Sequence, residues 1–371
     1  MPRVTHELGD PSAAGAVATR MSPGPSLASC PGSGAWIVAL GLVLGACRAS
    51  DRHAARESTS EVEGEPGSAD PPSLPPAHEA VGPTSSLSPE LRAALADTPH
   101  FSPIPEPQPG DWLSSHPESG QTLAQFLGSA PNVPGAPRET IYLLPIGEFG
   151  GEGSPPLAVL EDYTHAFFGL EIQRLPTISV DSLEAEAREH HGHRQLHASS
   201  VLAGLQKVLP DDAYCLIGLT MEDLYPDEKW NYVFGYASVT ERVGVYSFAR
   251  YDPAFFGEPR PPGVETLILR RSLHVMSHEI GHMFGLQHCV HYSCNMNGTN
   301  SLEEADRQSS HLCPVCLRKL HATTGLDPVA RYEALGAFYR AHELRTEAAW
   351  TSTRLDYIRA HSPRLERDSP R

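Results

Sequence analysis

The stretch His278–His288, HEIGHMFGLQH, decides how this 371-residue chain is interpreted. His278 and His282 are four residues apart, so on a helix both imidazoles face one side and can converge on a cation, with Glu279 beside it. Gly285 can adopt the left-handed conformation that ends a helix and turns the chain sharply. That turn can bring His288 back to the same metal as a third ligand.

Three protein ligands leave one position open for water, as catalytic zinc requires. In such a site zinc lowers the pKa of the bound water, and the glutamate is a base rather than a ligand. The sequence therefore predicts a zinc hydrolase with His278, His282 and His288 as metal ligands and Glu279 as the general base. Two similar stretches, HEAVG at His78 and HELRT at His342, lack the second histidine and carry no such prediction.

Four of the seven cysteines follow within 28 residues: Cys289, Cys294, Cys313 and Cys316. Four thiolates would fill a tetrahedral zinc shell, so a metal held there would brace the fold without binding water. The spacing alone equally allows disulfides, including a pairing of Cys313 with Cys316. His291 lies among these residues but has no place in either set of ligands, and it is expected to be a solvated surface residue. Cys215, within an apolar run, is expected to be an inert core thiol.

The long histidine motif resembles that of the metzincin clan of zinc peptidases, in which a methionine forms a floor beneath the metal. Met296, eight residues after His288, stands where that Met-turn is expected. The continuation, with Cys289 directly after His288 and CPVC further on, resembles the archaemetzincin family. Segments such as GDWLSSHPE, DAYCLIGLTMEDLYP and HLCPVCLRKL extend the likeness over roughly residues 101–357.

This resemblance implies a compact, metzincin-like catalytic domain with two zinc ions and a peptide or protein substrate. One zinc would be catalytic, on His278, His282 and His288. The other would be structural, on the four clustered cysteines. By analogy with metzincins, the segment VGVYSFARY lines the substrate cleft, where Tyr246 or Tyr251 can reach the site and stabilise an oxyanion.

Residues 1–47 have the pattern of a signal segment. Arg3 and Arg20 precede the apolar run WIVALGLVLGAC, and Leu44–Cys47 resembles the lipobox of bacterial lipoproteins. We expect export, with membrane anchoring through lipid on Cys47; the alternative is an uncleaved leader on a cytoplasmic protein. Residues 48–100 are expected to be a disordered tether with a short helix near Pro89–Ala96, residues 101–362 the catalytic domain, and residues 363–371 a disordered tail.

The pattern of the catalytic domain predicts an α+β or α/β fold with a mixed, twisted sheet. Buried strands are expected over Glu139–Gly147 and Asp212–Thr220, and a hairpin around Thr240–Arg242 at the sheet edge. Helices are expected over 157–168 and 197–209, with a long active-site helix over 264–284 and a helical C-terminal part. His190–His197, HHGHRQLH, is expected to be a polar loop leading into a helix rather than a third metal site.

The net charge of −17 argues against a nucleic-acid partner, because nothing concentrates Lys and Arg against phosphate. A monomer is expected. Two alternatives to a peptidase remain open from the sequence. One is a zinc-braced protein that binds peptides without cleaving them, and the other is a zinc amidase acting on cell-envelope peptides.

Overall fold

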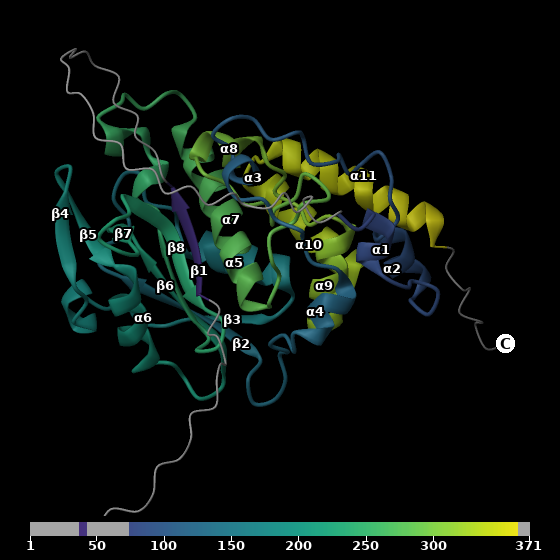
Figure 1. Ribbon diagram of the computed structural model, residues 1–371, viewed down its shortest axis with the longest axis horizontal. Coiled ribbons are helices and arrows are strands. Elements are labelled where there is room, and N and C mark those ends of the chain that lie inside the picture. The colour runs from purple at the N-terminus through teal and green to yellow at the C-terminus, as the bar shows by residue number, and fades with distance from the viewer. Residues whose placement is uncertain (1–36, 43–73, 363–371) are drawn as a thin grey trace, which may run out of the picture. The chain divides into compact units, whose positions relative to one another are not determined.

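The computed structural model describes residues 37–42 and 74–362. A mixed nine-stranded sheet forms its centre, with the order β3-β2-β6-β9-β8-β7-β5-β4 and with β1 paired to β8 beside that path (Figure 1). The strands are β1 Ile37–Leu42, β2 Thr140–Ile146, β3 Glu171–Arg174, β4 Ala187–His190, β5 His193–His197, β6 Ala213–Thr220, β7 Asp223–Tyr225, β8 Tyr232–Ser238 and β9 Val243–Ser247.

Strands β3, β2, β6 and β9 pair in parallel, and β8 returns antiparallel to β9. All eight residues of β6 are buried, which explains its unbroken apolar sequence, because a strand covered on both faces shows no alternation. Successive residues of β2 enter different core clusters: Ile141 and Leu143 face one, Tyr142 and Leu144 the other. The sheet therefore separates two layers of covering helices.

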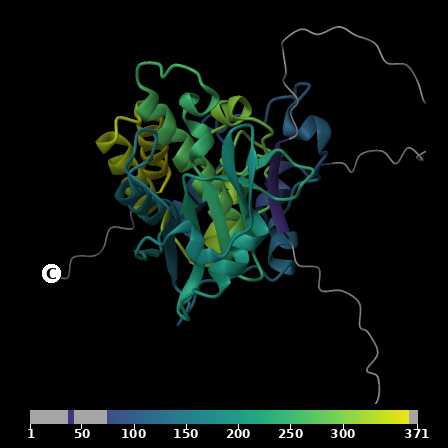
Figure 2. The ribbon, with the colours of Figure 1, turned by 90° about the vertical axis from the view of Figure 1, so that its left-hand side faces the viewer.

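One face is covered by α6 and the other by α5, α7 and the C-terminal helices, whose buried side chains join the corresponding clusters. Figure 2 shows the C-terminal helices, in yellow, on one side of the strands. The α-helices are α1 Ala77–Val81, α2 Pro89–Ala94, α3 Trp112–Ser115, α4 Leu123–Gly128, α5 Leu157–Phe168, α6 Ala198–Gln206, α7 Val264–Met283, α8 Leu302–Arg307, α9 Pro314–Thr324, α10 Pro328–Ala341 and α11 Arg345–His361. Three 3-10 helices cover Val180–Leu183, Ala249–Tyr251 and Pro253–Phe256.

The hairpin expected around Thr240–Arg242 forms as β8 and β9, but its placement at the sheet edge is wrong. β9 lies against β6, and β7 and β1 both pair with β8 on its other side. The sheet continues beyond β8 because β7, β5 and β4 extend it. The expectation failed because two of those strands, β4 and β5, lie in a polar stretch whose sequence favours a loop.

The polar loop predicted over His190–His197 is also wrong, since this stretch is most of the β4–β5 hairpin. His191 and Gly192 both have positive φ, 51° and 82°, the signature of a two-residue type I′ turn. Gln195 and Leu196 in β5 are fully buried, and Gln195 donates a hydrogen bond to Asp223 at 2.6 Å. Burial of these two side chains fixes the strand despite its histidine-rich sequence.

The tether expected over residues 48–100 does not extend to residue 100. α2 lies where a short helix was expected, and together with α1 it packs into the main core, where Ala80 and Leu91 are buried. Arg354 of α11 is fully buried and donates to the carbonyls of Ala93 and Ala94 at 2.8 and 2.7 Å. An arginine that satisfies the free carbonyls at a helix end holds α2 firmly to the domain.

Residues 1–36, 43–73 and 363–371 lie outside the described part of the chain, and with them Cys47, most of the expected signal segment and tether, and the tail. Within the described ranges, no helix combines the length and apolar character needed to cross a bilayer.

Candidate metal centres

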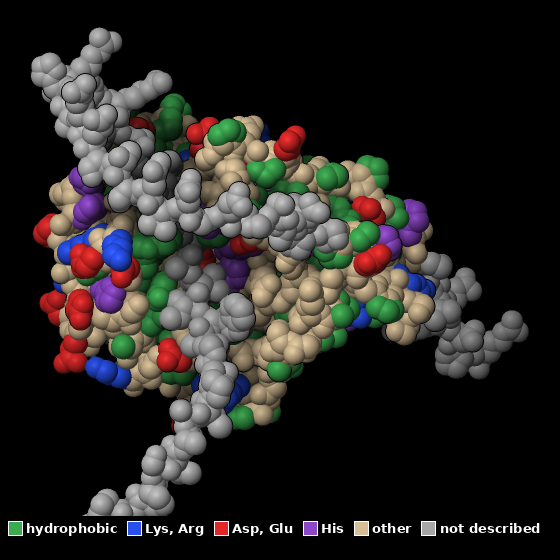
Figure 3. Space-filling view, in the orientation of Figure 1, with side chains coloured by type: hydrophobic (Ala, Val, Ile, Leu, Met, Phe, Trp, Pro, Cys, Tyr) green, Lys and Arg blue, Asp and Glu red, His purple; other side chains and the backbone are tan. Residues whose placement is uncertain are grey.

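Helix α7 and the turn after it bring three histidines together. His278, Glu279 and His282 lie in the buried last turns of α7, which ends at Met283. Gly285 has a φ of +82°, so the chain turns there as the sequence predicted. The ligand nitrogens of His278, His282 and His288 all lie within 4.8 Å of one another, and the Nε2 atoms of His278 and His282 are 3.0 Å apart. Histidine side chains, in purple, are visible near the middle of the face in Figure 3.

The Nδ1 atom of each ring is occupied by a hydrogen bond. His278 donates to the carbonyl of Asn295 at 2.8 Å and His282 to that of Leu286 at 2.6 Å, while His288 meets Oε1 of Glu118 at 2.8 Å. Carbonyl and carboxylate oxygens only accept, so Nδ1 carries the proton and Nε2 keeps its lone pair. Within the described structure, Nε2 of His288 is buried without a hydrogen-bond partner. Three convergent Nε2 lone pairs fit a metal ion.

Burial keeps two of these imidazoles neutral, those of His278 and His282. It holds the pKa of His278 well below its usual value and lowers that of His282 to about 3. For Glu118, burial alone would raise the pKa, but the hydrogen bonds and charge interactions with His288 and Trp112 outweigh it and lower the pKa. The ionised Glu118 is therefore an acceptor for the Nδ1 proton of His288.

Glu279 lies fully buried, and neither of its carboxylate oxygens has a hydrogen-bond partner in the described structure. Burial raises its pKa to about 8. The hydroxyls of Tyr246 and Tyr251 are likewise buried without partners, and burial, reinforced by the nearby Glu279, raises both of their pKa values. A Cβ at Gly235 of β8 would lie 3.1 Å from the carboxyl carbon of Glu279 and 2.7 Å from the Tyr246 ring, so only glycine fits there.

Met296 lies directly beneath α7. Its side chain is fully buried, and a Cβ on Gly281 would come within 2.5 Å of its sulfur. Gly281 stands immediately before His282, so the methionine packs where the helix presents its second histidine. The neighbouring Asn295 supplies the carbonyl that orients His278. The loop 294–297 therefore supports the histidine cluster from below.

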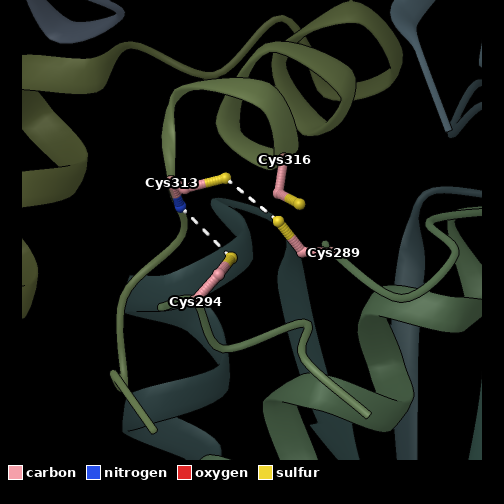
Figure 4. Close-up of side chains that lie close together, drawn as sticks. All are labelled: Cys289, Cys294, Cys313 and Cys316. Atoms are coloured by element: carbon pink, nitrogen blue, oxygen red, sulfur yellow. Dashed lines mark hydrogen bonds between the residues drawn. The ribbon is translucent and has the colours of Figure 1, made fainter. Parts of the chain in front are cut away.

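A second cluster gathers the four cysteines Cys289, Cys294, Cys313 and Cys316, whose side chains point toward one another (Figure 4). All four are buried and free, and their sulfur atoms lie within 4.8 Å of one another. The Cys289 and Cys313 sulfurs are 3.5 Å apart, far beyond the ~2.05 Å of a disulfide bond. The Cys294 sulfur accepts the backbone N–H of Cys313 at 3.3 Å. Four convergent free sulfurs fit a closed tetrahedral site.

The other candidate residues take simpler roles. His291 belongs to neither cluster, but it is half-buried against Gly120, so the expectation of a solvated surface residue is wrong. Cys215 is fully buried in β6, where burial raises its pKa, which agrees with an inert core thiol. Glu118 and Asn295 were missed from the sequence, because neither stands at a spacing that marks a metal site.

A buried cluster of three imidazoles with convergent nitrogens beside a helical glutamate defines the class of zinc-dependent hydrolases with an HExxH helix. The model of peptidase family M54 matches residues 177–322. Archaemetzincin-2 of Macaca fascicularis is 38% identical over 264 residues, which cover 63% of this chain and 73% of that protein. Archaemetzincin-1 of Rattus norvegicus is 34% identical over 292 residues, covering 69% of this chain and 58% of that protein.

Among solved structures, the archaemetzincin of Methanopyrus kandleri is 28% identical, with a TM-score of 0.39 over 52% of this chain and 98% of that one. On the strength of the sequence relatives, the chain belongs to the archaemetzincin family. It is a zinc-dependent metallopeptidase.

Proposed function

We propose that this metallopeptidase cleaves peptide bonds at the histidine cluster, with Glu279 as the general base. The observation that carries the proposal is the convergence of three proton-free Nε2 atoms next to a buried carboxyl group without a partner. His278, His282 and His288 would hold the zinc. When bound there, zinc supplies a Lewis acid that polarises a carbonyl and lowers the pKa of water.

Glu279 accepts a proton from the attacking water and returns it to the leaving amine. Burial raises its pKa to about 8 in the metal-free protein, and the positive charge of a bound zinc would lower that pKa and favour the carboxylate form that accepts a proton. Tyr246 and Tyr251 keep their protons at neutral pH since burial raises their pKa values. Their hydroxyls therefore remain hydrogen-bond donors near Glu279, able to meet negative charge that develops on the substrate. Met296 would be the methionine of the Met-turn, with its side chain packed beneath the zinc.

The four cysteines would hold a second, structural zinc, which gives two zinc ions per chain. Their free thiols and their burial support this assignment over disulfides. Such a zinc would tie the start of α9 to the loop after α7. Because Cys289 follows His288 and Cys294 precedes Asn295, the same metal would fix the loop that positions two of the catalytic histidines.

The test is a peptide-library cleavage profile of the metal-replete protein, with its zinc content measured in parallel. We expect cleavage of ordinary peptides by protein with about two zinc ions per chain. Cleavage of cell-envelope fragments alone would indicate an amidase instead. A protein that carries both metals and cleaves no peptide would be a binding protein, and the proposal would fail.

For location we propose export with a lipid anchor on Cys47, on the basis of the apolar run and the lipobox-like Leu44–Cys47. Processing at Cys47 would remove β1, Ile37–Leu42, so the mature sheet would keep the other eight strands. Metabolic lipid labelling of the wild type and of Cys47→Ser tests this. Label in the wild type that disappears in the variant is the expected result. An unlabelled wild type would rule out the anchor.

A further inference from the structure

His288 differs from the other two histidines in the group that orients it. His278 and His282 donate to backbone carbonyls of the same short stretch, at Asn295 and Leu286. His288 instead meets the side-chain carboxylate of Glu118, 170 residues earlier in the sequence. A mutation can therefore remove the orienting group of His288 alone, without altering the backbone of the site.

Glu118 is itself held in place. Its Oε1 atom also accepts the indole N–H of Trp112 at 2.9 Å, and the Trp112 ring lies edge-on to His288 with centroids 5.2 Å apart. The backbone N–H of Trp112 in turn donates to buried Glu304 at 3.0 Å. A Cβ at Gly298 would lie 2.5 Å from the Trp112 ring and 2.8 Å from Nδ1 of His288, so the three side chains leave no free space.

The same segment also supports the backbone that leads to His288. The Gln121 side chain donates to the carbonyl of Gly285 at 3.3 Å and accepts the N–H of Gln287 at 3.2 Å. Buried Lys319 donates to the same Gln121 oxygen at 3.1 Å. The hydrogen bond between Glu118 and His288 is therefore one of several contacts between this segment and the turn that leads to His288.

A carboxylate on the second nitrogen of a metal-binding histidine fixes the tautomer, fixes the ring orientation and makes the other nitrogen a stronger ligand. We propose that Glu118 is the positioning residue of His288, holding Nε2 toward the zinc and strengthening its bond to the metal. This inference rests on the proposed function, since it assigns a role at the same site. Glu118 would act through His288 and is not among the residues assigned to hold the metal.

The test compares the zinc affinity of the full-length wild type, E118A and E118Q, measured by competition with a chelator. E161Q is the matched control, because the Glu161 side chain is 26% exposed against 28% for Glu118 and pairs with Arg174 instead. We expect the zinc of the histidine cluster to bind about 10- to 100-fold less tightly in E118A. E118Q should lose less, because the amide oxygen still accepts the bond, and E161Q should match the wild type.

Steady-state kinetics on a cleaved peptide give a second readout. Both Glu118 variants should lower kcat with little change in KM, because a residue that acts through a metal ligand affects the reaction step rather than peptide binding. Zinc affinity within about twofold of the wild type in E118A would overturn the inference. So would an equal loss in E161Q, which would point to general destabilisation.

If E118A does not fold, the zinc affinity of E118Q is the deciding measurement. A zinc affinity reduced at least about threefold supports the role of the charge, and an unchanged affinity overturns it. His278→Ala separates this inference from the proposed function. If that variant holds as much zinc as the wild type, the histidine cluster binds no zinc and the proposed function itself fails. If it loses one zinc while E118A matches the wild type, only the role of Glu118 is lost.

Discussion

The buried carboxyl of Glu279 should make the protein less stable as the pH rises whenever the histidine site is free of metal. In the folded protein its pKa is raised to about 8, against 4.5 for an exposed glutamate. A raised carboxyl pKa gives stability that is fully present below pH 4.5, where both states are protonated. That stability is lost as the pH rises through about 8.

The size of the loss follows from the two pKa values. One pKa unit is worth about 1.4 kcal/mol, so the shift corresponds to about 5 kcal/mol at a pH above the folded value. The substitution Glu279→Gln keeps the shape and removes the titration. The substitution also changes the unfolding free energy by an amount that is the same at every pH, because the amide is buried too. The expected signature is therefore a difference in unfolding free energy between variant and wild type that grows by about 4 kcal/mol from pH 5 to pH 9, in favour of the variant, because the remainder is already lost below pH 5.

Urea unfolding at several values between about pH 5 and pH 9, with the cysteine cluster loaded and the histidine cluster stripped, measures this difference. With zinc restored to the histidine cluster the slope should shrink, because a nearby cation stabilises the carboxylate. A difference that stays constant within about 1 kcal/mol over this range would refute the reasoning, since Glu279 would then titrate like an exposed residue.

Three further substitutions follow from the structure. Arg354→Met should destabilise the fold by roughly 3 kcal/mol in urea unfolding, because it leaves the buried carbonyls at the end of α2 unpaired. Cys316→Ser should lower the zinc content from about two to about one per chain and reduce the melting temperature. Gly235→Ala should lower kcat at least about tenfold, because the added methyl group must displace the Tyr246 ring or Glu279.

Each of these has a matched control. Arg359→Met removes an exposed arginine of the same helix, paired with Glu333, and should cost less than about 1 kcal/mol. Cys215→Ser removes a buried thiol outside the cluster and should keep both zinc ions. Gly244→Ala on β9 meets its nearest atom, Cβ of Ala237, at 3.3 Å, and neither Glu279 nor Tyr246 supplies any of its three nearest atoms, so it should retain activity. Equal effects in a variant and its control would contradict the corresponding prediction.

Local patterns in the sequence predicted the local elements well. The helix expected over 264–284 lies at Val264–Met283, the one over 157–168 lies at Leu157–Phe168, and the buried strand expected from Asp212 lies at Ala213–Thr220. The turn at Gly285 after α7 was also predicted. In each case residues close in sequence determine the backbone, through periodicity or the need for a positive φ.

What sequence could not predict depends on contacts between distant segments. Arg354 looks like a surface residue of a helix until its guanidinium is seen to bind the end of α2. The strands β4 and β5 are polar, and only their pairing in the sheet makes them strands. The position of the β8–β9 hairpin depends on those strands in turn. Glu118 meets His288 across 170 residues, so no spacing could have revealed it.

The central claim is that Glu279 performs the proton transfer at a zinc held by the three histidines. The most direct test measures peptide cleavage and zinc content of Glu279→Ala beside those of His282→Ala. We expect Glu279→Ala to keep about two zinc ions per chain and to lose cleavage by a factor of at least ~100, while His282→Ala loses one zinc ion. A metal-replete Glu279→Ala that cleaves peptides at the wild-type rate would contradict the claim.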